Sequence, residues 1–205
     1  MAIITSLDEL RGGKVLRGEA ISMRAFEAPA TVHSQSDEVL YLIEKDEGIH
    51  LPAGAEVRIE ERATVIAVSG GQAISPVRTG RIACPPPIRL EDQSVQRTGD
   101  RWYRELIQSE ITQFVGSIPP GRAPDHFHLY EEVLCILQGE GFLWADGAQT
   151  PVGRGSCVYL PKRNVHCLEN TGSGELRLLG VFYPAGSPAV RYGVDQSADS
   201  GPDRR

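Results

Sequence analysis

Two short motifs between Gly121 and Asn170 constrain this chain more than any other feature, because together they gather side chains that can bind one metal ion. His126 and His128 are one residue apart, and side chains alternate along a β-strand, so both imidazoles should face the same side. Glu132 should lie on the next strand, after a tight connection. The sequence therefore predicts these three side chains as ligands of a single ion.

The second motif supplies a fourth ligand, His166, from a distant strand. A single histidine in a strand is usually a partly buried, hydrogen-bonded side chain. Here, however, three of the chain's 5 histidines lie in these two motifs, between glycine and proline turn signals. Three imidazoles and a carboxylate suit one divalent transition metal per chain. Fe(II) is favoured, with Mn(II), Ni(II), Zn(II) and Cu(II) as alternatives.

The spacing of these residues resembles that of the cupin superfamily. The family's first motif is matched by Gly121, His126, His128, Glu132 and Gly139, and its second by Gly155, Pro161, His166 and Asn170. One position departs from the pattern, since Arg163 stands where the family usually has glycine. That glycine permits a turn with positive φ, so the turn before His166 is expected to be reshaped without loss of a ligand. The resemblance implies a small jelly-roll β-barrel with the metal inside.

We predict an all-β protein of two tandem cupin barrels, a bicupin-like arrangement in which the N-terminal barrel is degenerate. The expected order is a degenerate cupin-like domain over residues 1–83, a linker over 84–99, a metal-binding cupin domain over 100–192 and a flexible tail over 193–205. The run from Cys84 to Pro87 marks the linker, because consecutive prolines are stiff and extended. One alternative stays open, in which the first strands extend a single barrel.

The N-terminal half reads as a decayed copy of the C-terminal half. Residues 37–43 resemble residues 131–137 in character, and His33 precedes them as the histidine pair precedes Glu132. Only one histidine is present, however, and Val57 occupies the position of the second motif's histidine. A site made of His33 and Glu38 alone would bind a divalent ion weakly, if at all, so this half is predicted to be metal-free.

Local signals indicate one short helix and many strands. Ser6 and Glu9 form a capping box, and the glycine pair Gly12-Gly13 should end that helix within two turns. The turn dipeptide Asp146-Gly147 indicates a hairpin. Alternating or short apolar runs predict strands within residues 21–26, 39–43, 63–68, 102–107, 111–115 and 176–182.

The composition limits the kinds of partner that this protein is expected to bind. The formal net charge is -6 and the isoelectric point about 5.4, which leaves no basic field for nucleic acid or an anionic membrane. No apolar run approaches the roughly 20 residues of a membrane helix. The N-terminus lacks a signal-peptide pattern, so a cytoplasmic location is expected. The 4 cysteines have no CxxC spacing and are read as reduced. Exposed barrel edges are compatible with a homodimer.

The resemblance and the ligand set together favour an enzyme. Strand parity should turn Leu134, Ile136 and Leu168 inward with the ligands, which gives an apolar pocket for a small organic substrate. The leading interpretation is a mononuclear metal-dependent dioxygenase. The first alternative is a redox-silent isomerase, lyase or decarboxylase, and the second is a non-catalytic metal- or ligand-binding module.

Several polar or aromatic residues are candidates for a role beside the metal. Tyr130, Gln113 and Arg104 are the candidate catalytic residues, and Trp144 is a further residue that could contact the substrate. For each of them, packing in the core or exposure on the surface is the more common role. None of them is identified as a general base.

Overall fold

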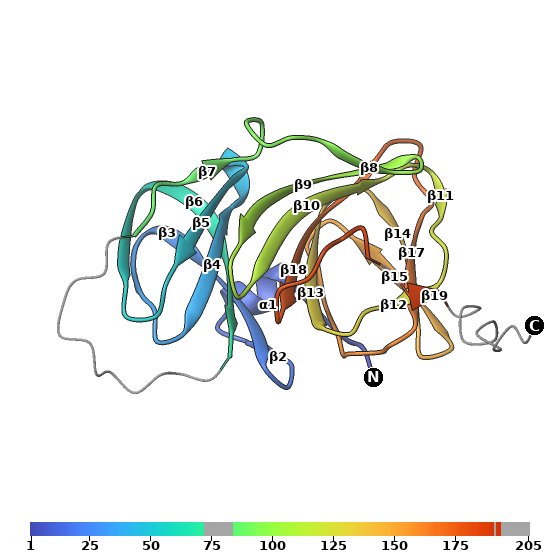
Figure 1. Ribbon diagram of the computed structural model, residues 1–205, viewed down its shortest axis with the longest axis horizontal. Helices are drawn as coiled ribbons and strands as arrows, with labels where there is room; N and C mark the ends of the chain where they lie inside the picture. The colour runs from blue at the N-terminus through green and yellow to red at the C-terminus, as the bar shows by residue number, and fades with distance from the viewer. Residues whose placement is uncertain (72–83, 191, 194–205) are drawn as a thin grey trace, which may run out of the picture.

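The computed structural model describes residues 1–71, 84–190 and 192–193. Three sheets carry nearly all of its regular structure, which confirms the predicted all-β fold class. Figure 1 shows two units side by side, with the N-terminal strands on the left and the C-terminal barrel on the right. Among the described residues, no helix has the length and apolar character needed to cross a membrane.

The N-terminal unit is one 6-stranded sheet that curls around a core of its own. Its longest strands, β3 (Ile21–His33) and β6 (Glu56–Gly70), are antiparallel partners along most of their length. The remaining strands are β2 (Leu16–Arg17), β4 (Asp37–Leu42), β5 (Glu47–Leu51) and β7 (Ile88–Arg89). These strands include the predicted runs at 21–26 and 63–68. They also include the run at 39–43 except for its last residue, which begins a short 3-10 helix (Ile43–Lys45).

The C-terminal barrel is built from two facing sheets, consistent with the jelly-roll prediction. One sheet has 7 strands in the order β1-β16-β13-β18-β10-β9-β8, and the other has 6 strands in the order β15-β14-β17-β12-β19 with β11 beside β17. The first comprises β1 (Ile3–Ser6), β8 (Gln96–Thr98), β9 (Arg101–Gln108), β10 (Thr112–Ile118), β13 (Glu131–Gln138), β16 (Ser156–Leu160) and β18 (Leu176–Tyr183). The second comprises β11 (Gly121–Arg122), β12 (His126–Phe127), β14 (Glu140–Ala145), β15 (Ala148–Gly153), β17 (His166–Asn170) and β19 (Tyr192–Gly193).

Strand alternation divides the interior into separate cores. On β13, Leu134 and Ile136 point into the C-terminal barrel, whereas Val133 and Cys135 point toward the N-terminal unit. On β4, Val39 and Tyr41 meet them in the shared core, while Leu40 and Leu42 fill the N-terminal unit's own core. Both strands are therefore buried on two faces, which is why they read as continuous apolar runs.

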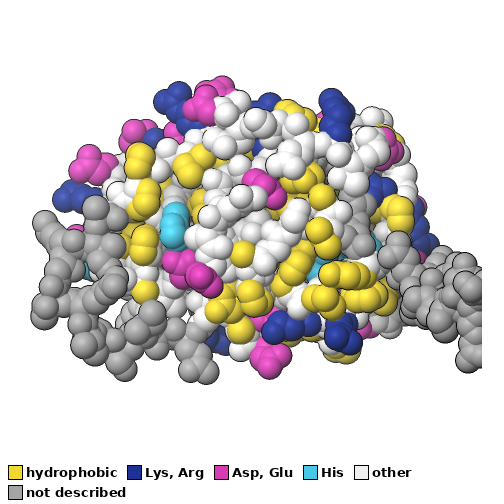
Figure 2. Space-filling view, viewed as in Figure 1, with side chains coloured by type: hydrophobic (Ala, Val, Ile, Leu, Met, Phe, Trp, Pro, Cys, Tyr) yellow, Lys and Arg dark blue, Asp and Glu magenta, His cyan; other side chains and the backbone are white. Residues whose placement is uncertain are grey.

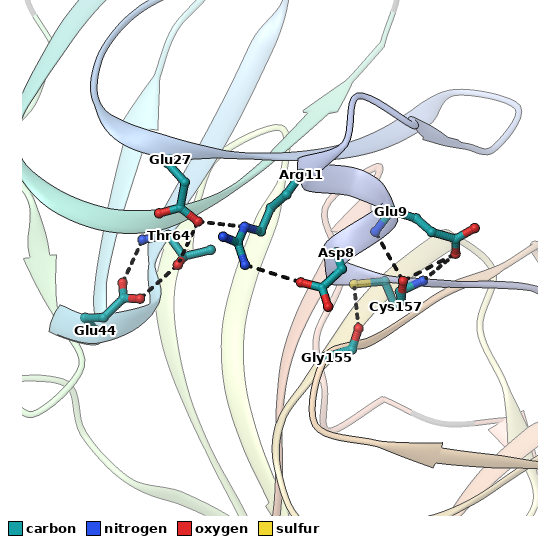
Figure 3. A network of polar contacts seen from close by, with 9 residues as sticks. Asp8, Glu9, Arg11, Glu27, Glu44, Thr64, Gly155 and Cys157 are labelled. Atoms are coloured by element: carbon teal, nitrogen blue, oxygen red, sulfur yellow. Dashed lines mark hydrogen bonds and ion pairs between the residues drawn. The ribbon is translucent and has the colours of Figure 1, made fainter.

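The N-terminal helix α1 (Leu7–Arg11) lies against both units. Its predicted capping box is present, because Glu9 N–H donates to Ser6 Oγ at 3.2 Å and Ser6 N–H donates to Glu9 Oε2 at 3.0 Å. From its last turn, Arg11 reaches Glu27 Oε1 on β3 at 2.6 Å. Figure 3 shows this polar network continuing through Thr64 to Glu44. The strand before the helix, β1, pairs with β16, so a piece of the predicted first domain belongs to the C-terminal sheet.

The predicted linker is partly ordered into strands. β7 pairs with β5 of the N-terminal sheet, and β8 pairs with β9 of the C-terminal sheet, so residues 84–99 are attached to both units. Leu90, between the two strands, is buried in the shared core. Of the predicted tail 193–205, residues 194–205 lie outside the described part of the chain. The four cysteines are free thiols in the structure, as expected.

Candidate metal centre

The four predicted ligands converge at one end of the C-terminal barrel. His126 on β12 is the register partner of His166, the first residue of β17. The ligand nitrogens of the three histidines all lie within 4.8 Å of one another. Glu132, near the start of β13, places its Oε2 atom 3.6 Å from His128 Nε2 and 3.6 Å from His166 Nε2. These residues come from three separate strands and one loop, and only the fold brings them together.

Backbone carbonyls set the orientation of two of the imidazoles. His126 Nδ1 lies 3.0 Å from the Pro124 carbonyl oxygen, and His166 Nδ1 lies 2.8 Å from the Asn164 carbonyl oxygen. Because a carbonyl can only accept, each Nδ1 carries the proton and each Nε2 keeps its lone pair. This is the second hydrogen bond that usually orients a metal-ligating histidine.

The spacing of the donor atoms fits a divalent metal. A separation of 3.6 Å between Glu132 Oε2 and the histidine nitrogens is too long for a hydrogen bond. Two ligand atoms each bound about 2.1 Å from one ion would lie roughly 3.0–3.4 Å apart, close to this value. Glu132 Oε2 is also buried without a hydrogen-bond partner among the described residues. A cation between these atoms would satisfy that oxygen.

The electrostatics of the cluster favour a neutral His126 beside an ionised Glu132. Burial, followed by the nearby His166 and His128, lowers the pKa of His126 to about 3. Burial alone would raise the pKa of Glu132, but the surrounding histidines outweigh it, and the pKa is lowered. Burial alone would lower the pKa of His166, yet the Glu132 carboxylate outweighs it and raises the pKa. An anionic glutamate among imidazoles is the protonation state that binds a cation.

His128 differs from its neighbour in its local structure. The strand β12 ends at Phe127, so the alternation expected for both histidines applies only to His126. The two rings nevertheless remain 4.9 Å apart between centroids. Tyr130 stacks on the His128 ring at 4.8 Å and 13°, and its hydroxyl donates to the Ser187 carbonyl oxygen at 2.8 Å. Of the three candidate catalytic residues, Tyr130 is the one that contacts a ligand.

The turn before His166 keeps the geometry that a glycine would give. Arg163 adopts a φ of 62° on the exposed side of this turn, so the expected reshaping does not occur. Its N–H donates to the His128 carbonyl oxygen at 2.7 Å. The arginine therefore accepts a strained left-handed backbone, and the hydrogen bond ties the second motif to the first.

Gln113 and Arg104, two of the candidate catalytic residues, lie away from the histidines. Gln113 is fully buried between the two units, where its Nε2 donates to the Leu40 carbonyl oxygen at 3.3 Å. Arg104 donates to the Leu90 carbonyl oxygen at 2.8 Å in a separate cleft. The reason is strand parity, since their neighbours Phe114 and Tyr103 take the inward positions.

Trp144 also faces away from the ligands. Its Nε1 donates to Glu169 Oε2 at 2.8 Å, and the Arg122 guanidinium lies 4.1 Å above its ring. It is not among the residues that line the cavity next to the histidines.

A cavity of about 100 Å³ opens beside the four predicted ligands. Its aromatic walls are Tyr103, Phe114 and Phe182, and its aliphatic walls include Leu134, Leu168 and Leu178. Arg101 also lines it. Neither the aromatic walls nor Arg101 was predicted, because alternation on residues 101–107 shows which side chains share a face but not which face is inward.

The corresponding residues of the N-terminal unit have other partners. His33 is exposed, and its Nδ1 lies 3.0 Å from Glu56 Oε2. Glu38 is buried and accepts from Arg24 Nη2 at 2.7 Å. Burial raises the pKa of Glu38 despite this ion pair. His33 and Glu38 are thus held by different neighbours rather than directed at a common point.

The fold and the site define a jelly-roll barrel with a histidine cluster suited to one metal ion. Residues 114–182 match the family model described as Cupin domain. This segment contains all four predicted ligands. It also contains β17 and nearly all of β18, the central strands of the two sheets of the C-terminal barrel. By this match, residues 114–182 resemble a cupin domain.

Two curated proteins show related sequences. The uncharacterized protein MJ1618 of Methanocaldococcus jannaschii is 35% identical over 54 residues, which are 26% of this chain and 43% of that protein. An uncharacterized protein of Aquifex aeolicus is 27% identical over 108 residues, which are 50% of this chain and 88% of that protein. The match thus spans less than half of the first relative's length.

Solved structures of Bacillus subtilis oxalate decarboxylase share the fold over nearly the whole chain. One, from a study of the Mn(II) centers of that enzyme, has a TM-score of 0.67 at 14% identity and covers 98% of this chain and 77% of that chain. Another, determined at pH 4.6, has a TM-score of 0.66 at 14% identity, with 98% and 76% covered. At this identity the likeness establishes the fold and not the activity.

Proposed function

We propose that this protein is a mononuclear metal-dependent cupin enzyme acting on a small organic molecule, and that its reaction is a dioxygenase reaction. The observation that carries the proposal is the convergence of His126, His128, Glu132 and His166 at the end of an apolar cavity. These four residues would hold one divalent metal, with Fe(II) favoured. When bound, such an ion supplies a Lewis acid and, if it is redox-active, a centre for oxygen chemistry.

The composition of the cavity supports oxygen chemistry over proton transfer. Apart from the ligands themselves, no carboxylate or imidazole lines it among the described residues. An isomerase or a lyase ordinarily needs such a group as general acid or base. Tyr103 does not supply one, because its hydroxyl donates to Gln96 Oε1 at 2.7 Å. The chain's own residues therefore serve to hold the metal, exclude water and orient the substrate.

A second candidate is a redox-silent reaction at the same metal, such as a decarboxylation. The fold likeness to an enzyme studied for its Mn(II) centers, oxalate decarboxylase, favours this alternative. It would use Mn(II) in place of Fe(II) on the same ligands. A purely metal- or ligand-binding module is the remaining candidate.

The test begins with elemental analysis of protein purified without a His-tag or chelator. Oxygen uptake is then measured after anaerobic loading with Fe(II), against a panel of small phenols, diketones and thiols. One equivalent of iron with substrate-dependent uptake is the expected result. One equivalent of manganese without uptake would favour the redox-silent reaction, and no bound metal would refute the enzyme proposal in both forms.

A further inference from the structure

Arg101 carries a positive charge into a cavity that is otherwise apolar. It lies at the start of β9, on the same face as Tyr103, and both side chains line the cavity beside the histidines. Its side chain is only 18% exposed. Among the described lining residues it is the only lysine or arginine. A guanidinium in this position is costly unless something compensates for its lost hydration.

The described part of the protein offers the Arg101 guanidinium few hydrogen-bond or ion-pair partners. A guanidinium has five N–H donors in a fixed fork. The one carboxylate near it in the described structure is that of Asp100, whose Oδ1 lies 3.8 Å from Nε and therefore accepts no hydrogen bond. Asp100 is itself largely exposed, at 72%, so water screens this pair. The donors of Arg101 are left available to a molecule inside the cavity.

We propose that this cavity binds small monocarboxylates, with the carboxylate on Arg101 and a short apolar body against Tyr103, Phe114 and Phe182. This assignment of the substrate class rests on the proposed function of the same site. A guanidinium fork matches a carboxylate in geometry and charge, and the paired hydrogen bonds are among the strongest in proteins. The aromatic rings offer only apolar surface to the rest of the molecule.

Size and lining together restrict the ligand further. A cavity of about 100 Å³ admits a body of only a few non-hydrogen atoms. Away from the ligands and Arg101, the lining residues with polar side-chain groups are Thr98, Ser117, Tyr103 and Trp102, and none of these is cationic. A second carboxylate would lose its hydration against hydrocarbon unless the metal received it. In metal-free protein, a monocarboxylate should therefore bind better than oxalate.

The test compares butyrate with its neutral isostere butyramide by ligand-observed NMR titration. Protein stripped of metal with EDTA is used first, so that no ion can receive the carboxylate. Wild-type protein is expected to bind butyrate about 10- to 100-fold more tightly than butyramide, since one charge-assisted interaction separates the two probes. Oxalate is expected to bind more weakly than butyrate. Equal affinities for butyrate and butyramide, or tighter binding of oxalate, would overturn the proposal.

Two variants locate the effect at Arg101. Arg101→Gln is expected to abolish the preference for butyrate, and Arg101→Lys to retain part of it. Arg104→Gln is the matched control, because Arg104 lies on the same strand but faces another cleft, and its preference should equal that of wild type. A preference that persists in Arg101→Gln would overturn the assignment. Circular dichroism of each variant ensures that folded proteins are compared.

Metal content separates this proposal from the proposed function. A chain that binds no metal but shows the Arg101-dependent preference supports the carboxylate site and refutes the metal enzyme. A chain that binds one metal ion and shows no preference refutes the carboxylate site alone.

Discussion

Burial and backbone hydrogen bonds set the state and orientation of the proposed histidine ligands. The pKa of His126 is lowered to about 3 by burial and by its histidine neighbours, so the ring is neutral at physiological pH. Hydrogen bonds from Nδ1 of His126 and of His166 to backbone carbonyls leave both Nε2 atoms unprotonated, and Nε2 of His166 lies 3.6 Å from Glu132 Oε2. Since these orienting groups belong to the backbone, a side-chain substitution at a ligand removes the ligand without disturbing the geometry around it.

Replacing either His126 or His166 with alanine is expected to remove most of the metal and leave the barrel folded. Loss of one of four ligands should weaken binding by at least about 100-fold, by comparison with the 10- to 100-fold cost of losing an orienting partner. Metal content by elemental analysis, with circular dichroism as the test of folding, checks this. His33→Ala is the matched control, because His33 is exposed and paired with Glu56, and it should leave metal content unchanged. Unchanged metal in both ligand variants would refute the assignment.

At the scale of single elements, hydrogen bonds at turns and helix ends position the segments around the site. The turn before His166 is fixed by the N–H of Arg163, which donates to the His128 carbonyl oxygen at 2.7 Å. The Glu9 carboxylate caps the N-terminus of helix α1. It accepts hydrogen bonds from Ser6 N–H and from Thr5 Oγ1. The first device joins residues that are far apart in the sequence, whereas the second lies within residues 5–9.

Arg163→Gly is expected to stabilise the protein by about 0.5 kcal/mol. Relief of the left-handed strain, about 1 kcal/mol, exceeds the added flexibility of the unfolded chain only slightly. Arg163→Pro should instead destabilise it by about 3 kcal/mol, because proline cannot adopt a φ of 62° and lacks the N–H. Urea unfolding of the two variants measures both effects. A stable proline variant with full metal content would show that this turn does not secure the site.

The pKa of Glu9 predicts an acid-dependent contribution to stability. Hydrogen bonds from Thr5 and Ser6, followed by Lys14, lower this pKa from 4.5 to about 2. A lowered pKa means that the stabilisation is present above pH 4.5 and is lost as the pH falls toward 2. The Tm of Glu9→Gln should therefore lie below that of wild type at pH 6, and the gap should close toward pH 2. A gap that stays constant with pH would refute this account, and Glu60→Gln on the exposed side of β6 serves as control.

At the scale of the whole molecule, a buried carboxylate fastens the N-terminal unit to the metal-binding barrel. Glu131 is 1% exposed and precedes the proposed ligand Glu132 on β13, so the two carboxylates point to opposite faces. Glu131 accepts from the backbone N–H groups of Glu19 at 2.8 Å and Ala20 at 2.7 Å, and from the Tyr159 hydroxyl at 2.6 Å. Burial and this carboxylate raise the pKa of Tyr159 to about 12, which keeps its hydroxyl a donor.

Glu131→Gln is expected to lower the free energy of unfolding by about 2–3 kcal/mol while leaving the metal content near one equivalent. A carboxylate can accept from all three donors, whereas the amide would turn an NH₂ group toward one of them. Urea unfolding and elemental analysis measure the two quantities. Glu140→Gln, at an exposed position of β14, should change stability by no more than about 0.5 kcal/mol. A loss of metal in Glu131→Gln without a loss of stability would contradict this separation of roles.

The surface of the molecule carries charges of both signs. Figure 2 shows acidic and basic side chains interspersed around the rim of one face, with hydrophobic side chains nearer its middle. The formal net charge is -6. On the face shown in Figure 2 the described residues mix acidic and basic side chains.

The sequence by itself determined the class of fold and the residues that could bind a metal. Period-two alternation and turn residues are local properties, so they located most strands, the capping box at Ser6 and the hairpin at Asp146-Gly147. The spacing of His126, His128, Glu132 and His166 is likewise visible in the chain alone. The sequence also shows Arg163 at a position where the family usually has glycine, but not the φ of 62° that this residue adopts.

Only the tertiary structure decided which face of each strand looks inward and what lies opposite it. Alternation leaves two equivalent faces, and long-range pairing chooses between them. It turned Gln113 and Arg104 away from the ligands and turned Phe114, Tyr103 and Arg101 toward them. Long-range pairing also placed β1 beside β16, because an edge strand has unpaired N–H and C=O groups that can bond another strand.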